Sequence, residues 1–314
     1  MNPMRRGAAT VLTAALALTS LAAASPVAEG RGRLDREAAA VKKLTRSNAW
    51  ELEKSIDLKF DTFHMQGMSL VGEHIWISSV EIIEPTTKYP KPVDGMDRSP
   101  GKGRGHVFVV TRDGELVKDI VVGEGDMHHP GGIDFDGKRV WVPVAEYRPY
   151  SKAVVYTIDP RTYQVREAFR ADDHVGGVVH DRRAKKIAAV TWGSREFLTF
   201  KKRTGRLVDE QRNPSAMVDY QDCEYSGAGT MICTGITGLK DADGKAFELG
   251  GVALLDIRSG SLINEVPVQV YSNNGHVVTR NPVAFQAKGS TLTMFSAPDD
   301  GEEGSELLVH TTQI

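Results

Sequence analysis

The sequence predicts an all-β protein folded as a single five-bladed β-propeller. A His-x-x-Gly phrase occurs at His64, His129 and His174, and each copy opens an apolar run. The first two copies keep their register further along, since Trp76 and Trp141 follow their histidines at equal spacing. Each copy reads as strand, short turn, strand, with another strand pair behind it. Four-stranded units that repeat at roughly 45 to 65 residues are typical of propeller blades.

The fourth and fifth units are degenerate copies in which other residues replace the histidine. Tyr220 stands at the motif position of the fourth unit, and Arg280 at about that of the fifth. The fifth unit has three strands before the chain ends, whereas residues 49–60 form a strand with no hairpin of its own. We therefore expect the N-terminal strand to complete the last blade, which leaves no open edge between first and last blades. Six blades are the alternative count.

Residues 45–314 are predicted to form one domain, because all-β folds often exceed 200 residues as a single unit. Residues 1–24 contain two arginines, an apolar run and a small-residue cleavage site, which together predict a secretory signal peptide and a secreted protein. Residues 25–44 are charged and rich in alanine, so we expect a flexible or weakly helical leader. No later apolar segment is long enough to span a bilayer.

The charge balance argues against nucleic acid as a partner. The formal net charge is −2 and the pI is about 6.5, so the chain has no large basic surface for phosphate groups. We expect a monomer whose partners are a small polar ligand or a glycan.

Two cysteines, Cys223 and Cys233, flank the turn Ser-Gly-Ala-Gly-Thr symmetrically in the fourth unit. They should therefore face each other across a hairpin, and a disulfide is expected if the protein is exported. Two buried free thiols are the alternative.

The repeat also predicts where a functional site lies. The innermost strand of every blade begins on the same face of a propeller, so the three motif histidines should surround the channel mouth together with Tyr220 and Arg280. Glu81 and Glu146, at equal spacing after the first two histidines, should lie slightly further out. Gln66, Tyr147 and Arg148 are further candidates for ligand binding.

The histidines are also candidate ligands for one divalent metal ion, because neutral imidazole nitrogens suit such ions. His64, His129, His174, Glu81 and Glu146 are accordingly the candidate catalytic residues. The alternative is structural: each histidine caps a strand or hydrogen-bonds the neighbouring blade. Titratable residues at positions where large apolar residues would fill the channel favour a site.

The segment Phe-His-Met-Gln-Gly-Met, which includes Gln66 and Gly67, resembles the first blade of the five-bladed propeller glutaminyl cyclotransferases, which carries Phe-Thr-Gln-Gly-Leu. That resemblance implies a secreted five-bladed propeller. Gly131-Gly132 replaces the Glu-Gly of that family in the second blade, so its catalytic acid is not carried over. The His-x-x-Gly pattern also resembles secreted bacterial propeller families without an assigned activity. The three histidines are similar, at the level of the fold, to the metal ligands of propeller lyases.

Two functions compete at this point. The first is a secreted propeller whose His/Glu-lined pocket binds a small polar ligand, with metal-assisted or acid–base chemistry of the lyase, hydrolase or cyclotransferase type. The second is a non-enzymatic scaffold that binds a protein or a cell-wall glycan through its face loops. The absence of a Gly-x-Ser-x-Gly elbow and of a lone nucleophilic cysteine beside a histidine argues against a serine or cysteine hydrolase.

Overall fold

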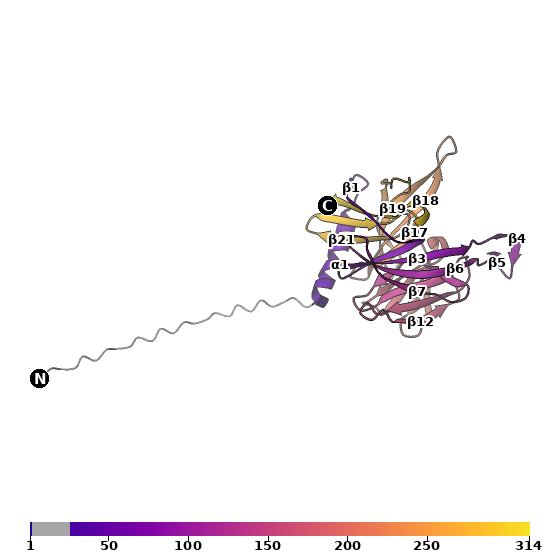
Figure 1. The fold of residues 1–314 in the computed structure, drawn as a ribbon, viewed down its shortest axis with the longest axis horizontal. Coiled ribbons are helices and arrows are strands. Elements are labelled where there is room, and N and C mark those ends of the chain that lie inside the picture. Colours follow the sequence, from indigo (N-terminus) through magenta and orange to yellow (C-terminus); the bar gives the residue numbers. More distant parts are fainter. Residues whose placement is uncertain (2–25) are drawn as a thin grey trace.

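The protein is a five-bladed β-propeller, as the sequence predicts (Figure 1). The computed structural model describes residue 1 and residues 26–314, the side chains of 26–34 excepted. Blade 1 consists of β2 (His64–Val71), β3 (His74–Glu84), β6 (Lys102–Thr111) and β7 (Leu116–Val122). Blade 3 consists of β13 (Gly177–Asp181), β14 (Lys186–Val190), β15 (Glu196–Lys201) and β16 (Leu207–Arg212). Blade 4 consists of β17 (Asp219–Tyr225), β18 (Thr230–Lys240), β19 (Ala246–Asp256) and β20 (Leu262–Val268).

Blade 2 has an interrupted innermost strand. Its two pieces, β8 (Met127–Pro130) and β9 (Asp134–Phe135), both pair with β10 (Val140–Glu146). The blade is completed by β11 (Ala153–Ile158) and β12 (Val165–Ala171). The break falls at the two glycines of the second motif, where the backbone turns toward the neighbouring blade: Gly132 forms a parallel bridge with Gly177.

The last blade joins the two ends of the chain. It contains β21 (Val283–Lys288), β22 (Thr291–Ser296) and β23 (Glu306–Gln313), and its fourth strand is β1 (Glu51–Asp57). The pairing of β1 with β23 is antiparallel and runs from Glu51 opposite Thr311 to Asp57 opposite Glu306. The predicted closure by the N-terminal strand is therefore confirmed. Five blade sheets account for the described residues, which excludes the six-bladed alternative.

Helix α1 (Pro26–Lys43) occupies the segment for which the sequence predicted a flexible or weakly helical leader. Its last turn and the residues after it bury Ala40, Val41 and Leu44 in a cluster with strands of blades 4 and 5, and Figure 1 shows the helix beside β21. The Asn264 side chain donates hydrogen bonds to the carbonyls of Val41 and Leu44. The helix forms because the propeller surface covers these small apolar side chains. The predicted signal peptide, residues 1–24, lies outside the described segments.

Motif glycines allow the innermost strands to approach one another closely. A Cβ atom added to Gly131 would lie 2.1 Å from the carbonyl oxygen of Gly176, and one added to Gly67 would lie 2.6 Å from the Cα of Gly132. No side chain fits in these spaces, because real Cβ atoms do not approach backbone atoms below 3.0 Å. The glycines of the first two copies therefore have a packing role around the channel, whereas a Cβ atom added to Gly176 would make only ordinary contacts.

Three buried carboxylates connect the blades inside the channel. Asp222 of blade 4 accepts a hydrogen bond from the backbone nitrogen of Met68 in blade 1 at 2.7 Å. Glu224 accepts one from Phe285 of blade 5. A third carboxylate, Asp134 of blade 2, accepts hydrogen bonds from His180 of blade 3 and Tyr225 of blade 4. The inner edge of each innermost strand has N–H groups without a carbonyl acceptor on another strand. These carboxylates accept hydrogen bonds from such N–H groups and occupy the channel.

Cys223 and Cys233 form the predicted disulfide between β17 and β18. They lie directly opposite each other, with Cα atoms 4.1 Å apart and a sequence separation of 10. Both are buried in the cluster between blades 3 and 4.

Reduction of this disulfide is expected to lower the free energy of unfolding by about 2 kcal/mol, because the closed loop is short and the entropy it removes from the unfolded chain is modest. Denaturant unfolding with and without a reductant measures the effect. The double variant Cys223→Ala/Cys233→Ala is the control, since its midpoint should not respond to the reductant. Equal midpoints for the oxidised and reduced wild-type chains would contradict the expectation.

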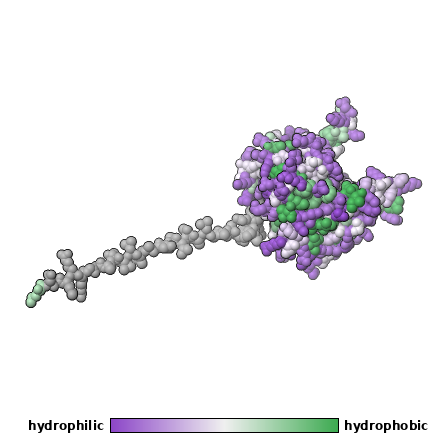
Figure 2. Space-filling model, viewed as in Figure 1, coloured by the Kyte–Doolittle hydropathy of each residue, from purple (hydrophilic) through white to green (hydrophobic). Residues whose placement is uncertain are grey.

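Two hairpins project from the propeller body (Figure 1). One is the insertion of blade 1, β4 (Lys88–Val93) with β5 (Met96–Arg98). The other is the outer part of the β18–β19 hairpin, whose pairing extends to Lys240 opposite Ala246. Both carry exposed apolar side chains among polar ones, as Figure 2 shows for the visible face. No helix among the described residues has both the length and the apolar character required to cross a membrane.

Candidate functional site

A cavity of about 320 Å³ lies where the innermost strands of the five blades begin. Its walls include the three motif histidines, His64, His129 and His174. Gln66, Tyr147, Tyr220 and Arg280 also line it. The structure thus brings together seven of the residues that the sequence analysis selected: six stand at or near the start of an inner strand, and Tyr147 follows the end of β10 on the same face. Their chemical roles stay predictions.

His64 is held by a carboxylate from the last blade. Its Nδ1 lies 2.7 Å from Oδ1 of Asp300, and since a carboxylate only accepts hydrogen bonds, the ring donates from Nδ1. Asn281 donates to the same oxygen at 3.3 Å. Burial disfavours the charged carboxylate, but the hydrogen bond from His64 and the charges of His64 and Arg280 outweigh it and lower the pKa of Asp300. The Nε2 of His64 is thereby left as the ring's other functional atom.

His174 is a neutral imidazole with a defined tautomer. Its Nδ1 donates to the backbone carbonyl of Glu146 at 2.9 Å. Burial lowers the pKa of His174 to about 4, against an ordinary value of 6.5. The ring therefore carries its single proton on Nδ1 near neutral pH, and Nε2 is a hydrogen-bond acceptor.

This buried imidazole predicts a loss of stability in mild acid. The unfolded chain binds a proton at His174 below pH 6.5, whereas the folded protein does so only near pH 4. The free energy of unfolding should fall across that window by roughly 3 kcal/mol on account of this residue. Denaturant unfolding between pH 4 and pH 7.5 measures it. His174→Gln should flatten the profile and the half-exposed control His74→Gln should not; parallel profiles for wild type and His174→Gln would refute the interpretation.

An aromatic wall forms one side of the cavity. The ring of His129 stacks on Tyr147 with centroids 4.2 Å apart and an interplanar angle of 6°. Trp192 contacts both Tyr147 and His174, at 5.4 and 4.9 Å between centroids. Burial lowers the pKa of His129 well below its ordinary value, and the neighbouring histidines lower it further. The guanidinium of Arg98, from the hairpin inserted in blade 1, lies 5.0 Å from the Trp192 ring centre, so this insertion reaches the cavity wall.

Arg280 lies among carboxylates. Its guanidinium nitrogens are 3.4 Å from Asp300, 3.8 Å from Glu248 and 3.8 Å from Glu303. Its positive charge is therefore compensated within the protein, which reduces its attraction for an anionic ligand.

Three predicted site residues do not line this cavity. Glu81 is paired with Arg104 at 3.1 Å on the extended part of blade 1. Glu146 and Arg148 are paired with each other at 2.5 Å and line a separate depression next to the inserted hairpin. The two glutamates do have equal spacing, but their side chains lie outside the cavity and pair with arginines. Glu146 contributes to the site through its backbone carbonyl, which accepts the hydrogen bond from His174.

The three motif histidines are not drawn together as a compact ligand set. The rings of His64 and His129 are 6.1 Å apart between centroids. No three ligand atoms from His64, His129 and His174 approach within 4.8 Å of one another, although all three residues are described. Each instead has another partner: the Asp300 carboxylate, the Tyr147 ring and the Glu146 carbonyl. A metal ion bound to these three residues stays a prediction.

Sequence reasoning missed Asp300, Trp192 and Asp219 as site residues. Asp300 and Trp192 lie on loops outside the repeated phrase, and their only sequence signals are an acidic loop after β22 and a tryptophan after β14. Asp219 lines the cavity one residue before Tyr220 and is bound by Arg195 at 2.5 Å. A charged residue next to a motif position was the signal for it.

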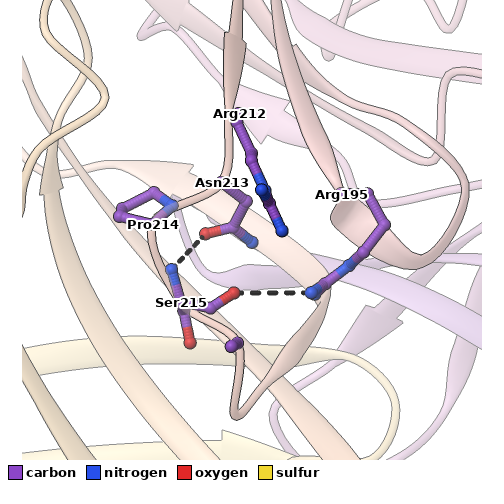
Figure 3. Close-up of a pocket in the computed structure, with 6 residues that line it drawn as sticks. Arg195, Arg212, Asn213, Pro214 and Ser215 are labelled. Atoms are coloured by element: carbon purple, nitrogen blue, oxygen red, sulfur yellow. Dashed lines mark hydrogen bonds between the residues drawn. The ribbon is translucent and has the colours of Figure 1, made fainter.

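A second cavity, of about 280 Å³, lies beside Arg195 and the loop that joins β16 to β17. Figure 3 shows Arg195 donating to the carbonyl of Ser215, whose backbone nitrogen donates to the Asn213 side chain. These contacts fix Arg195 where it holds Asp219. We interpret this cavity as part of the support of the central site.

A model of the family of unknown function DUF6454 matches residues 32–312, which is nearly the whole chain. The chain belongs to this family. No curated protein sequence matches it. The DUF6454 chain is also similar in fold to several solved structures at low identity, and these structures are β-propeller-like proteins.

The tail fibre of Staphylococcus aureus phage P68 has a TM-score of 0.47 and 7% identity, over 85% of this chain and 53% of the other. The chain thus spans about half the length of that protein. A luciferin-regenerating enzyme has a TM-score of 0.46 and 12% sequence identity, over 85% of this chain and 96% of the other. The PQQ-bound aldose sugar dehydrogenase of Streptomyces coelicolor has a TM-score of 0.41 and 11% sequence identity, over 85% of this chain and 99% of the other. The comparisons do not show the similarity to glutaminyl cyclotransferases that the first blade suggested.

Proposed function

We propose that this DUF6454 protein is an exported β-propeller that binds a small polar ligand in its central cavity and transfers a proton to or from it through His64. The observation that carries the proposal is the hydrogen bond of 2.7 Å between His64 and Asp300 at the cavity wall. A carboxylate on Nδ1 orients the ring and fixes its tautomer, so that Nε2 faces the ligand as the atom that can exchange a proton with it.

The cavity favours a small ligand of low charge. At about 320 Å³ it is at the lower end of the range for ligand pockets, which excludes the bulk of a polymer. Arg280 and Asp219 each have a partner of opposite charge. Beside His64, the remaining groups are the neutral imidazoles of His129 and His174, amides and aromatic faces, which suit a compound with hydroxyl or amide groups and one apolar face.

A binding measurement tests the proposal. The purified protein is screened by thermal shift against monosaccharides, small hydroxy acids and cyclic amides, and any hit is titrated by calorimetry. Tyr147→Ala removes the face on which His129 stacks and should weaken binding at least tenfold, the loss typical of a buried aromatic contact. Tyr150→Ala is the matched control, because Tyr150 is exposed. His64→Gln should abolish turnover of the hit and retain binding. Unchanged affinity in Tyr147→Ala would place the ligand elsewhere and end the proposal.

The second candidate is a scaffold that binds a protein or a cell-wall glycan, and the projecting hairpins favour it. Val93, Leu239 and Phe247 are apolar and exposed on these projections, and exposed apolar residues on loops are common at interaction sites. Replacing residues 89–96 with a short Gly-Ser turn leaves Arg98 beside Trp192 and separates the two functions: loss of glycan binding with retained affinity for small ligands in the cavity would support the scaffold.

A further inference from the structure

A group of metal-ligand residues lies on the last blade, outside the ring of motif histidines. His276 is in the loop between β20 and β21, whereas Asp299 and Glu303 are in the loop between β22 and β23. One ligand atom of each residue lies within 4.8 Å of the others. A small movement of these side chains brings three ligands to one ion, since metal–ligand distances are about 2.0–2.2 Å.

His276 is oriented by a carboxylate of its own. Its Nδ1 lies 3.2 Å from Oε1 of Glu248. The other oxygen of Glu248 accepts a hydrogen bond from the backbone N–H of Val277 at 3.0 Å. The Nε2 of His276 lies 3.2 Å from Oε1 of Glu303. A carboxylate bound to one ring nitrogen, with the second nitrogen facing further ligands, is the usual arrangement around a metal-binding histidine.

The buried carboxylate of Asp299 is an independent indication of a cation. Asp299 is 1% exposed. Its Oδ1 accepts a hydrogen bond from Ser272 at 2.7 Å, but Oδ2 is buried without a hydrogen-bond partner. An unsatisfied carboxylate oxygen in the interior is costly, and native structures normally provide it with a donor or an ion. A bound cation would satisfy this oxygen.

The local charge also favours a cation. Four carboxylates gather here, those of Glu248, Asp299, Asp300 and Glu303, and all but Asp299 lie 3.4–3.8 Å from the guanidinium of Arg280. Asp300 is additionally paired with His64. The side chains of His276 and Glu303 are 22% and 39% exposed, so water can reach the group and complete the coordination of an ion.

We propose that His276, Asp299 and Glu303 bind one divalent transition-metal ion, with Glu248 as the positioning residue for His276. The imidazole nitrogen favours Zn²⁺ or Mn²⁺ over Ca²⁺, which prefers an all-oxygen ligand set. The ion takes the Nε2 lone pair, so that nitrogen must be free of its proton when the metal binds. The ion would connect the β20–β21 and β22–β23 loops one residue away from Asp300, the residue that orients His64. The site does not depend on a ligand in the central cavity.

Calorimetric titration of the chelator-treated, dialysed protein with ZnCl₂, MnCl₂ and CaCl₂ at pH 7.5 tests the site, and elemental analysis gives the stoichiometry. We expect one Zn²⁺ or Mn²⁺ per chain and no stoichiometric Ca²⁺. Asp299→Asn keeps the shape of the side chain and an acceptor for Ser272, and it should weaken binding at least tenfold, as should His276→Gln. His74→Gln is the matched control and should bind as wild type.

Thermal unfolding of each variant in chelator verifies that it is folded, and Asp299→Asn carries the test if His276→Gln does not fold. The absence of a stoichiometric ion in the wild-type protein would overturn the proposal. Equal affinities for wild type and Asp299→Asn would overturn it as well. Loss of the metal in His129→Gln with full retention in Asp299→Asn would assign the ion to the motif histidines instead, against this proposal.

Discussion

Replacing Gly131 by alanine is expected to destabilise the propeller on the order of 4 kcal/mol, which is at the extreme of single substitutions. The added Cβ would lie 2.1 Å from the carbonyl oxygen and 2.5 Å from the carbonyl carbon of Gly176. Both are backbone atoms of the next blade, so no side-chain rotation relieves the overlap. The inner strands of blades 2 and 3 would have to move apart, which would break the bridge between Gly132 and Gly177.

Denaturant unfolding of Gly131→Ala measures this effect. Gly238→Ala is the matched control, since Gly238 is exposed and a Cβ added there meets no atom within 4 Å. The control should stay within about 0.5 kcal/mol of wild type. A Gly131→Ala protein as stable as the control would show that the blades do not approach this closely, and the explanation of the repeated glycines would fail.

Replacing Asp222 by alanine is expected to cost about 3 kcal/mol or more. The Asp222 carboxyl accepts hydrogen bonds from Met68 in blade 1 at 2.7 Å and from Val283 in blade 5 at 3.4 Å. Alanine would leave both N–H groups buried without an acceptor, and each such group costs about 1–3 kcal/mol. The residue therefore acts as a connection between three blades.

Asp222→Asn separates the hydrogen bonds from the charge. Burial raises the pKa of Asp222 well above its ordinary value, and the backbone hydrogen bonds only partly oppose this. Because the pKa is raised, the contribution of the Asp222 carboxyl to the free energy of unfolding is greatest in acid, where the group is protonated. That contribution is lost as the pH rises through the pKa of the folded state. Asparagine keeps an acceptor without that titration, so its loss at pH 7 should be smaller than that of alanine. Equal losses for both variants in denaturant unfolding would contradict the role as an acceptor.

The propeller and the ring of residues around its cavity could be predicted because both depend on one repeated phrase. The phrase opens the inner strands of three blades, and its histidines precede the glycines at a fixed distance, so the period alone places His64, His129 and His174 on one face. The closing strand followed from the same count, since one blade had three strands and one N-terminal strand had none. The helix at residues 26–43 was not predicted as a fixed element, because its apolar face is small and is only covered once blades 4 and 5 exist.

The partners of the ring residues could not be predicted, since they come from loops that the repeat does not determine. Asp300 contacts His64 across 236 residues of sequence, a pairing that no local spacing indicates. Glu81 and Glu146 show the opposite case. Their spacing matches and both lie within the second strand of their blade, but both side chains pair with arginines from their own blades instead of lining the cavity.

The strand that completes the last blade has a consequence for the order of events during protein synthesis. Glu53 and Thr311, which are hydrogen-bonded across β1 and β23, are 258 residues apart. A nascent chain cannot form that pair until Thr311 has left the ribosome, so the other four blades can assemble before the fifth is complete. Contacts this distant slow folding, and the waiting β1 is a free edge that can pair with another chain. Synthesis of β23, Glu306–Gln313, therefore determines when the exposed edge of β1 is covered and can no longer pair with another chain.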